Sequence, residues 1–309
     1  MTGLRIGTRR SALALAQAEE VRIRLAEHGV DGELVPLATA GDEDLPRIAG
    51  TSAGLKGLWT DAIVDALIDE RIDLAVHSAK DLPAEDEDAL TIGAVPPRAD
   101  PSDVLVLREE GVLPAGASVG TDSVRRRAQL LAAFPGIAFV GLRGNVDTRL
   151  RKLEAGEADA AVLAAAGLAR LGLRPPNAHA LELDVMVPAP GQGALAVQCR
   201  QDDAAALEAL ARIDDPHSHH ALDAERSVMW RLGGGCALPL GAFAVADHGR
   251  VHLTAVVATP DGATILRSSA EARFAEEAAE QVTKGLIAQG AEAILAEVTS
   301  GATSLGDDA

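Results

Sequence analysis

The first part of the chain alternates short apolar segments with longer segments that carry apolar residues at helical spacing. Strands are expected at the apolar segments 4–8, 33–39, 73–77, 90–95, 104–107, 118–120, 137–140 and 160–163. Helices are expected at 12–28 and 59–71, and from Ser123 and Asn145 onward. This alternation predicts an α/β fold with mostly parallel sheets that helices cover on both faces.

Two proline-rich segments, 96–101 and 187–193, interrupt the alternation and predict crossings between domains. They divide the chain into a first domain of residues 1–97 and 193–214, with a strand expected at 194–199, and a second domain of residues 101–189.

Residues 216–309 have a different pattern, which predicts a third domain of α+β type. Its expected elements are a helix at 220–232, strands near 241–246, 251–258 and 264–268, and a helix at 271–298 broken at 285–290.

The chain has 309 residues, of which 2% are aromatic and none is tyrosine, and its formal net charge is −18. Nucleic-acid binding needs a broad positive face and stacking platforms, so both numbers argue against it. No apolar segment reaches the length of a membrane span, and no leader precedes the first expected strand. We therefore expect a cytoplasmic protein with reduced cysteines and no membrane or nucleic-acid partner. We also expect a monomer, since the sequence has no exposed apolar stripe.

Lysine and arginine together number 28, but only four of these residues are lysine. Three arginine-bearing segments, 8–11, 120–126 and 141–145, lie where a strand is expected to pass into a helix. Free N–H groups and planar guanidinium groups at such junctions bind carboxylates or phosphates. For one segment alone, a helix capped by Ser11 or Ser123 with solvent-facing arginines is the simpler interpretation. Three equivalent segments favour a site for a small polyanion.

Segment 77–83 follows an expected strand and concentrates polar groups. Asp81 in this segment could hold a proton or balance a transient cation, although a surface turn is an equal alternative from spacing alone.

Cys236 follows three glycines, which would leave its sulfur uncovered as a nucleophile or an attachment point. The alternative, a small buried hydrophobe, suits Cys199 better.

Residues 217–220 hold three histidines, but a solvated helix start is the simpler interpretation and no metal is expected.

Several motifs together resemble the porphobilinogen deaminase family. They are RIGTRRSALA (5–14), GLKGLW (54–59), HSAKDLP (77–83), VGTDSVRR (119–126), LRGNVDTRL (142–150), AGLARLG (166–172), PGQGA (190–194) and GGC (234–236). Their order and spacing cover roughly residues 4 to 241, far more of the chain than any single short motif.

The resemblance implies two α/β domains like those of periplasmic solute-binding proteins around a cleft, with a smaller α+β C-terminal domain. It also implies a dipyrromethane cofactor, held by a thioether on Cys236, and the head-to-tail condensation of four porphobilinogen molecules. One ammonia would leave at each step, and hydrolysis would free the linear tetrapyrrole hydroxymethylbilane.

The resemblance also assigns roles to individual residues, with Asp81 as the catalytic group. The residues expected to bind the cofactor are Lys80, Asp81, Thr121, Ser123, Arg125, Arg126 and Gly193. The residues expected to bind substrate are Arg9, Ser11, Lys56, Arg143, Arg149 and Arg170.

The chain departs from the family pattern at a few positions. Asp122 stands where a second hydroxyl residue is common, and it brings a negative charge to the anion site. Leu55 stands where a glycine is usual and Trp59 where a phenylalanine is usual; both differences would alter the Lys56 loop, which could act as a lid. Two rival interpretations remain. A non-catalytic module that captures an organic anion has no use for Cys236 or for Asp81 among arginines, and a cytosolic location suits it poorly. A thiol enzyme that uses Cys236 as nucleophile lacks a histidine partner for the cysteine.

Overall fold

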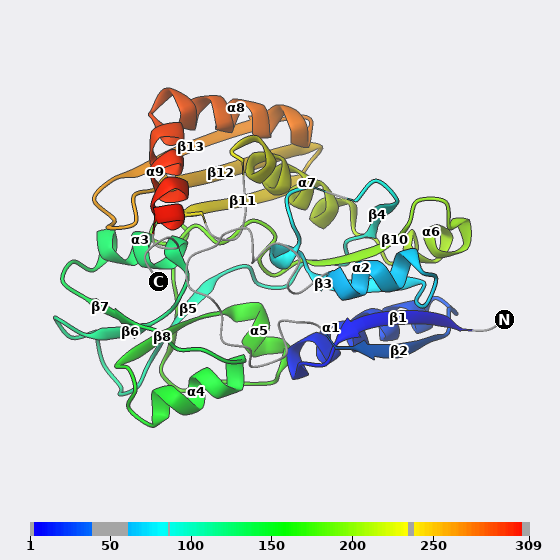
Figure 1. Ribbon diagram of the computed structural model, residues 1–309, viewed down its shortest axis with the longest axis horizontal. Helices are drawn as coiled ribbons and strands as arrows, with labels where there is room; N and C mark the ends of the chain where they lie inside the picture. Colours follow the sequence, from blue (N-terminus) through cyan, green and yellow to red (C-terminus); the bar gives the residue numbers. More distant parts are fainter. Residues whose placement is uncertain (1–2, 39–60, 86, 234–237, 305–309) are drawn as a thin grey trace.

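The computed structural model describes residues 3–38, 61–85, 87–233 and 238–304 (Figure 1). Two of its three sheets have five strands each and the third has three. The strands expected in the first two domains are all present in the described residues, and their ends differ from the expected ones by at most two residues. The fold class predicted from the sequence is therefore confirmed.

The first sheet has the order β2-β1-β3-β10-β4. Its strands are β1 (Leu4–Arg9), β2 (Gly32–Leu37), β3 (Leu74–Ser78), β4 (Leu90–Ala94) and β10 (Leu195–Arg200). Helices α1 (Ala12–Glu27) and α6 (Ala204–Leu210) share one apolar cluster with the sheet, and α2 (Asp61–Ile68) shares another. Cys199 is fully buried in the first of these clusters, as predicted.

The second sheet has the order β7-β6-β8-β5-β9. Its strands are β5 (Asp103–Leu107), β6 (Ser118–Gly120), β7 (Ala138–Val140), β8 (Ala160–Ala164) and β9 (Ala178–Ala180). Helices α3 (Val124–Ala133), α4 (Val146–Glu154) and α5 (Ala165–Arg170) accompany it. The sequence had not indicated β9, α5 or α6, which are all short.

The prediction of mostly parallel sheets is wrong. In the first sheet β1 is parallel to β2 and β3, but β10 is antiparallel to both β3 and β4. In the second, β6 is parallel to β7 and β8, but β5 is antiparallel to β8 and β9. The reason is topological, since β5 and β10 each follow a proline-rich crossing and so enter their sheet from the other α/β unit.

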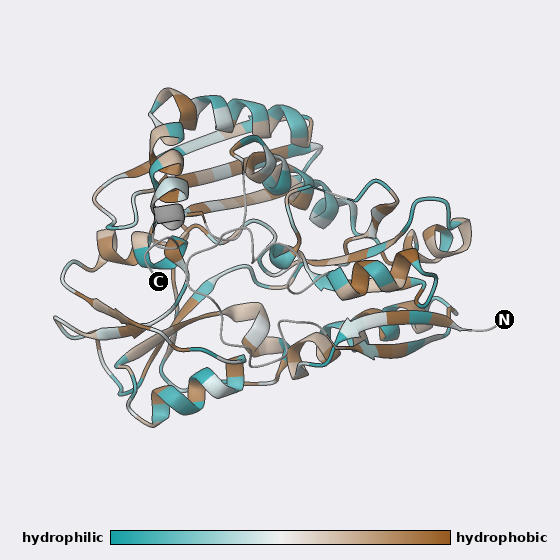
Figure 2. Cartoon of the chain, viewed as in Figure 1, coloured by the Kyte–Doolittle hydropathy of each residue, from teal (hydrophilic) through white to brown (hydrophobic). Residues whose placement is uncertain are grey.

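The third unit packs α7 (Pro216–Arg231), α8 (Ala275–Ala288) and α9 (Ala291–Ser304) with a three-stranded antiparallel sheet. The strands are β11 (Leu240–Asp247), β12 (Arg250–Ala258) and β13 (Ile265–Ala272). Figure 2 shows hydrophobic residues on the strands of the sheets, whereas α4 carries many hydrophilic residues.

Two helix boundaries in this unit differ from the prediction. Helix α7 starts at Pro216 rather than 220, because the Asp215 side chain caps it by accepting a hydrogen bond from the Ser218 amide. The segment from 271 begins as strand, and α8 starts only at Ala275. The break before α9 is short and centres on Gly290, whose φ is +101°.

Candidate active site

Lys80 and Asp81 lie in a 3-10 turn (Ala79–Asp81) that directly follows β3. Two buried side chains, Ala79 and Leu82, anchor this turn, and the Ala79 amide donates to Ala194 O at 3.1 Å. Gly191 also packs against it: a Cβ there would lie 2.9 Å from Lys80 N, and φ at Gly191 is +75°. The turn is therefore held in place from several sides, with Asp81 exposed to solvent.

The Lys80 ammonium lies between the two α/β units. Its Nζ donates to Gln192 Oε1 at 3.4 Å. Burial and the positive charge of Arg126 lower the pKa of Lys80 to about 8, against the opposite effects of Asp81 and Asp103. Since Arg126 belongs to α3, the Lys80 turn and the start of that helix share one electrostatic environment.

The predicted cofactor-binding segment forms the start of α3. The Ser123 hydroxyl caps this helix by accepting from the Arg126 amide at 3.4 Å, and the Ser123 amide donates to Thr121 Oγ1 at 3.2 Å. Thr121 is buried and Ser123 is partly exposed. A helix start of this kind presents N–H groups to an anion.

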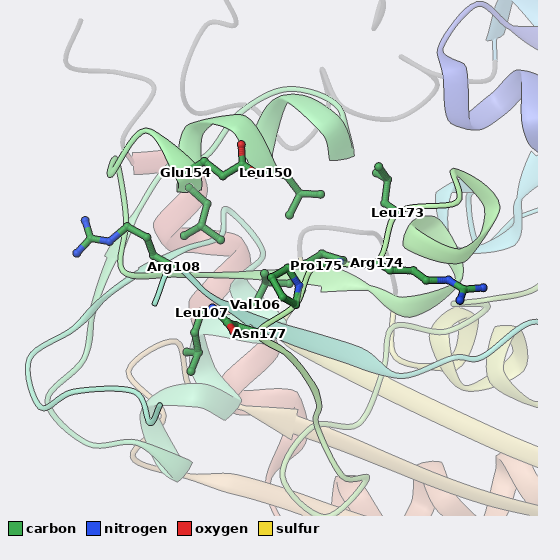
Figure 3. Close-up of a pocket in the computed structure, with 11 residues that line it drawn as sticks. Val106, Leu107, Arg108, Leu150, Glu154, Leu173, Arg174, Pro175 and Asn177 are labelled. Atoms are coloured by element: carbon green, nitrogen blue, oxygen red, sulfur yellow. The ribbon is translucent and has the colours of Figure 1, made fainter. Parts of the chain in front are cut away.

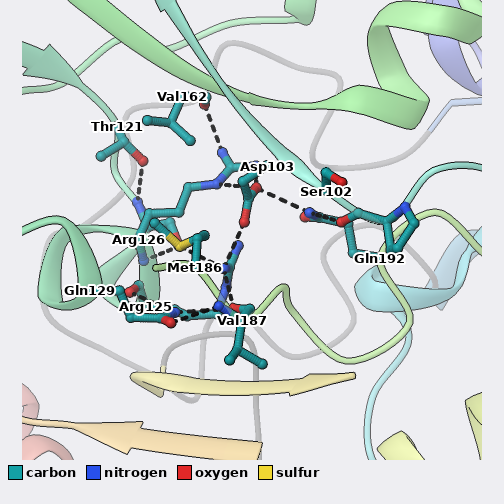
Figure 4. A network of polar contacts seen from close by, with 12 residues as sticks. Ser102, Asp103, Thr121, Arg125, Arg126, Gln129, Val162, Met186, Val187 and Gln192 are labelled. Carbon is teal, nitrogen blue, oxygen red and sulfur yellow. Dashed lines mark hydrogen bonds and ion pairs between the residues drawn. The ribbon is translucent and has the colours of Figure 1, made fainter. Parts of the chain in front are cut away.

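Arg125 and Arg126 are both buried, and both bind Asp103, which is 0% exposed (Figure 4). Arg125 Nη1 donates to Asp103 Oδ2 at 2.8 Å, and Arg126 Nε donates to Oδ1 at 2.9 Å. Burial raises the pKa of Asp103, but the two arginine charges outweigh it and hold that pKa well below its usual value. Asp103 thus cancels one of the two positive charges and leaves one for a ligand. The sequence had not singled out Asp103.

Arg143 and Arg149 follow β7, the strand beside β6. Arg143 is exposed in the loop before α4, whereas Arg149 is partly buried and its Nε donates to Gly144 O at 2.9 Å. Burial and the charge of Arg126 lower the pKa of Arg149, while Asp122 acts in the opposite direction. The charge of Arg126 therefore acts on both Arg149 and Lys80, and the charge of Asp122 acts on Arg149.

Three more residues were expected to bind substrate, namely Arg9, Ser11 and Arg170. Arg9 ends β1 and Ser11 caps α1, where its hydroxyl accepts from the Ala14 amide at 3.3 Å. Arg170 Nε donates to Glu20 Oε2 on α1 at 3.0 Å, and its side chain is 8% exposed. Arg170 thus ties the second unit to the first.

Gly193 lies in the second crossing and has a φ of +86°. Its carbonyl accepts from Ala99 N at 3.3 Å and from Arg170 Nη2 at 3.2 Å. A Cβ there would come within 2.5 Å of Ala99 O, so the two crossings lie directly against each other. Lys56 and Cys236, the remaining predicted residues, lie outside the described residues.

A cavity of about 290 Å³ in the second unit is separate from these groups (Figure 3). It lies between β5, α4 and the loop before β9, and its lining includes Val106, Leu150, Leu153, Leu173 and Pro175. Arg108 and Arg174 extend away to either side of it. Its lining contains none of the predicted site residues, so we do not assign the chemistry to this cavity.

The described part of the chain contains no helix long and apolar enough to span a membrane. Within the same residues no group of three or more His, Cys, Asp or Glu side chains is arranged to bind a metal. In the segment 217–220, His217 Nδ1 contacts Ala246 O at 2.8 Å and His219 Nδ1 contacts Asp214 Oδ1 at 2.7 Å.

Comparison with known proteins places the chain in a family. Residues 4–208 match "Porphobilinogen deaminase, dipyromethane cofactor binding domain", and residues 220–289 match "Porphobilinogen deaminase, C-terminal domain". The porphobilinogen deaminase of Brevibacillus brevis is 44% identical over 95% of this chain and 97% of its own. The Nocardia farcinica enzyme of the same name is 44% identical over 97% and 90%, respectively. Among solved structures, a methionine-binding protein aligns with a TM-score of 0.43 and 15% identity over 68% of this chain and 89% of its own, too weak a likeness to carry an argument. The chain belongs to the porphobilinogen deaminase family.

Proposed function

We propose that this chain joins porphobilinogen molecules at the cationic cluster, which we define as Lys80, Arg126 and Arg149, beside the exposed carboxylate of Asp81. Porphobilinogen carries an acetate and a propionate, so a growing chain is a polyanion that needs several fixed cations. The family match supplies the reaction, a head-to-tail condensation of four molecules to hydroxymethylbilane. The observation that carries the site is the hydrogen-bond chain that runs from Lys80 Nζ through the Gln192 side chain and Asp103 to Arg126, next to the anchored turn. The charge of Arg126 also acts on Arg149.

In each condensation the C–N bond of the protonated aminomethyl group of porphobilinogen breaks, and ammonia leaves with the electron pair. The substrate is left with a positive charge, which the Asp81 carboxylate would oppose while accepting a pyrrole N–H. The α-carbon of the acceptor pyrrole then forms the new C–C bond and loses its proton. Asp81 suits this role because the buried Ala79 and Leu82 fix the turn that presents it.

The residues at the start of α3 fit a cofactor that carries carboxylates. Lys80, Thr121 and Ser123 would hold its acid groups, through one ammonium, the side-chain hydroxyls and the N–H groups of the helix start. Arg125 and Arg126 would act mainly through the positive charge that Asp103 leaves uncancelled, because Arg125 Nη1 already donates to Asp103 and Val187 O, and Arg126 Nε and Nη1 already donate to Asp103 and Val162 O. Gly193 would act through the backbone of the crossing. When bound through a thioether to Cys236, a dipyrromethane supplies the first acceptor pyrrole.

The other predicted groups would bind the carboxylates of incoming substrate and of the lengthening chain; they are Arg9, Ser11, Lys56, Arg143, Arg149 and Arg170. Arg170 would have to exchange its contact with Glu20 for a substrate carboxylate. Such an exchange at the junction of the two α/β units would couple binding to movement between them.

We also propose the domain limits 1–97 with 193–214, 101–189, and 216–309. Strand β10 in the first sheet and β5 in the second support them, since each crossing then passes between units. We propose a cytoplasmic monomer. The large apolar side chains exposed among the described residues are scattered over several elements, as in many monomers.

The test is intact-protein mass spectrometry with peptide mapping of Cys236, on the wild type and on Cys236→Ser. We expect the wild type to carry the mass of two linked pyrroles on that sulfur and Cys236→Ser to lack it. Asp81→Asn should keep the added mass but lose nearly all turnover. An unmodified Cys236 that gains no mass on incubation with porphobilinogen would refute the attachment, and near-normal turnover of Asp81→Asn would refute its role.

A further inference from the structure

Gln192 is the central residue of the second crossing, and it is only 1% exposed. Its amide donates to Ala189 O at 2.9 Å, and its carbonyl accepts from Arg98 Nε at 2.9 Å. The neighbouring Gly191 and Gly193 both have positive φ and press against other backbone segments. The backbone therefore fixes where the Gln192 side chain points.

The Gln192 side-chain amide contacts both α/β units, and Figure 4 shows its contact with Asp103 of the second unit. Its Nε2 donates to Pro101 O at 2.7 Å and to Asp103 Oδ1 at 3.0 Å, and its Oε1 accepts from Lys80 Nζ at 3.4 Å. The opposite amide orientation would set its oxygen against two acceptors and its NH₂ against an ammonium. The chemistry of the neighbours therefore selects one orientation.

We infer that Gln192 is a positioning residue for the condensation, which holds the Lys80 ammonium of the first unit against the Asp103–Arg126 ion pair of the second. An amide suits this place because it has a donor at one end and an acceptor at the other. A glutamate would set a second carboxylate against Asp103, and a methionine would leave Lys80, Asp103 and Pro101 O each without this partner. The inference rests on the proposed role of Lys80 in the cationic cluster.

The charge state of Lys80 provides a readout that does not depend on turnover. The charged groups that act on Lys80 are Arg125 and Arg126 on α3, Asp103 on β5, and Asp81 on its own turn. Burial lowers the pKa of Lys80 to about 8, so its ammonium titrates within an accessible range. The Gln192 oxygen favours the ammonium form, because it accepts a hydrogen bond from it. Loss of that oxygen should lower the pKa, and a carboxylate in its place should raise it.

The experiment is trace acetylation of the full-length protein with acetic anhydride across pH, with peptide mapping of Lys80. Lys284, whose side chain is 73% exposed, serves as the internal reference. We expect the Lys80 reactivity midpoint to fall by about half a pH unit or more in Gln192→Met and to rise in Gln192→Glu. The Gln192→Asn side chain is one methylene too short to reach both partners, so this variant should also lower the Lys80 midpoint. It takes the place of Gln192→Met if the methionine variant does not fold.

Gln129→Met is the matched control. Gln129 is 2% exposed and holds the same crossing through Val187 N and O, without a hydrogen bond to Lys80. Its variant should lose stability but keep the Lys80 midpoint. A midpoint that does not move in the Gln192 variants, or that moves equally in Gln129→Met, overturns the inference. Near-normal turnover of Lys80→Met would instead refute the proposed role of Lys80, and the acetylation result would still decide whether Gln192 holds it.

Discussion

The two arginine segments of the second α/β unit share a sequence signature but have opposite surroundings. Each follows a parallel strand, and β6 and β7 lie side by side with Gly120 opposite Val140. Arg125 and Arg126 are buried around Asp103, whereas Arg143 is exposed. The difference is that a buried carboxylate lies beneath the first pair. Arginines at a helix start can therefore be buried against an internal carboxylate or exposed to solvent, and their spacing in the sequence does not distinguish the two.

The largest effect on this difference is expected from a substitution of Asp103. Asp103→Asn would leave two buried guanidinium groups without their counter-charge, so we expect the free energy of unfolding to fall by about 3–5 kcal/mol. Denaturant unfolding at neutral pH measures this loss. Asp147→Asn is the control, because Asp147 is 55% exposed and meets Arg151 only at 3.9 Å, so its loss should cost less than about 1 kcal/mol. Equal losses in the two variants would contradict the buried role of Asp103.

The first unit offers the same contrast within one segment, because His77 is buried whereas Asp81 is exposed. Burial lowers the pKa of His77 from 6.5 to about 4, only partly opposed by a hydrogen bond with Gln198. Protonation therefore favours the unfolded chain, and the stabilisation is complete above pH 6.5 and lost as pH falls toward 4.

A pH series of unfolding free energies tests this contrast. We expect wild type to lose about 3 kcal/mol more than His77→Asn between pH 6.5 and 4. His248→Asn, at a histidine whose side chain is 93% exposed, should follow the wild-type curve. If His77→Asn has the same pH dependence as wild type, then His77 is not held neutral by the fold.

The exposed segment should affect catalysis rather than stability. Arg143→Met would remove one charged hydrogen bond to a substrate carboxylate, which corresponds to a loss of about tenfold or more in kcat/KM. Its free energy of unfolding should change by less than about 0.5 kcal/mol. Arg127→Met is the control, since Arg127 is an exposed arginine of α3 that stacks on Phe139 at 5.1 Å. Steady-state kinetics that show equal losses for both variants would contradict a specific contact at Arg143.

The contrast between local and distant information also explains what the sequence could predict. Periodicity and capping are local, so the helix starts at Ser11 and Ser123 and the burial of Cys199 follow from a few neighbouring residues. The antiparallel insertion of β5 and β10 depends on which unit each crossing reaches, and no local pattern records that. Asp103 was missed because its two arginine partners lie 22 and 23 residues away along the chain.

The site residues divide in the same way. The arginine motifs indicated an anion site, but the burial of Arg125 beneath it depends on Asp103 and Val187, which are 22 and 62 residues away along the chain. Glu20 as the partner of Arg170 is 150 residues away. A signal was available for Asp103 alone, since a charged residue next to the apolar segment 104–107 is unusual unless a partner neutralises it.

The smallest effect is expected at Asp122, the exposed acid whose charge acts on Arg149. Its charge competes with a substrate carboxylate for this arginine, so Asp122→Ser should lower KM by about two- to threefold, near 0.5 kcal/mol. Because exposed charges are screened by salt, the difference from wild type should shrink as the ionic strength rises from about 0.01 to about 1 M, where the Debye length falls from about 30 to about 3 Å. Asp147→Ser removes an equal charge elsewhere on the second unit and separates a local effect from the net charge. A KM that stays the same at low salt, or that falls equally in both variants, would mean that Asp122 does not compete for Arg149. In that case Arg149, like Arg125, would serve the site from beneath rather than as a direct ligand.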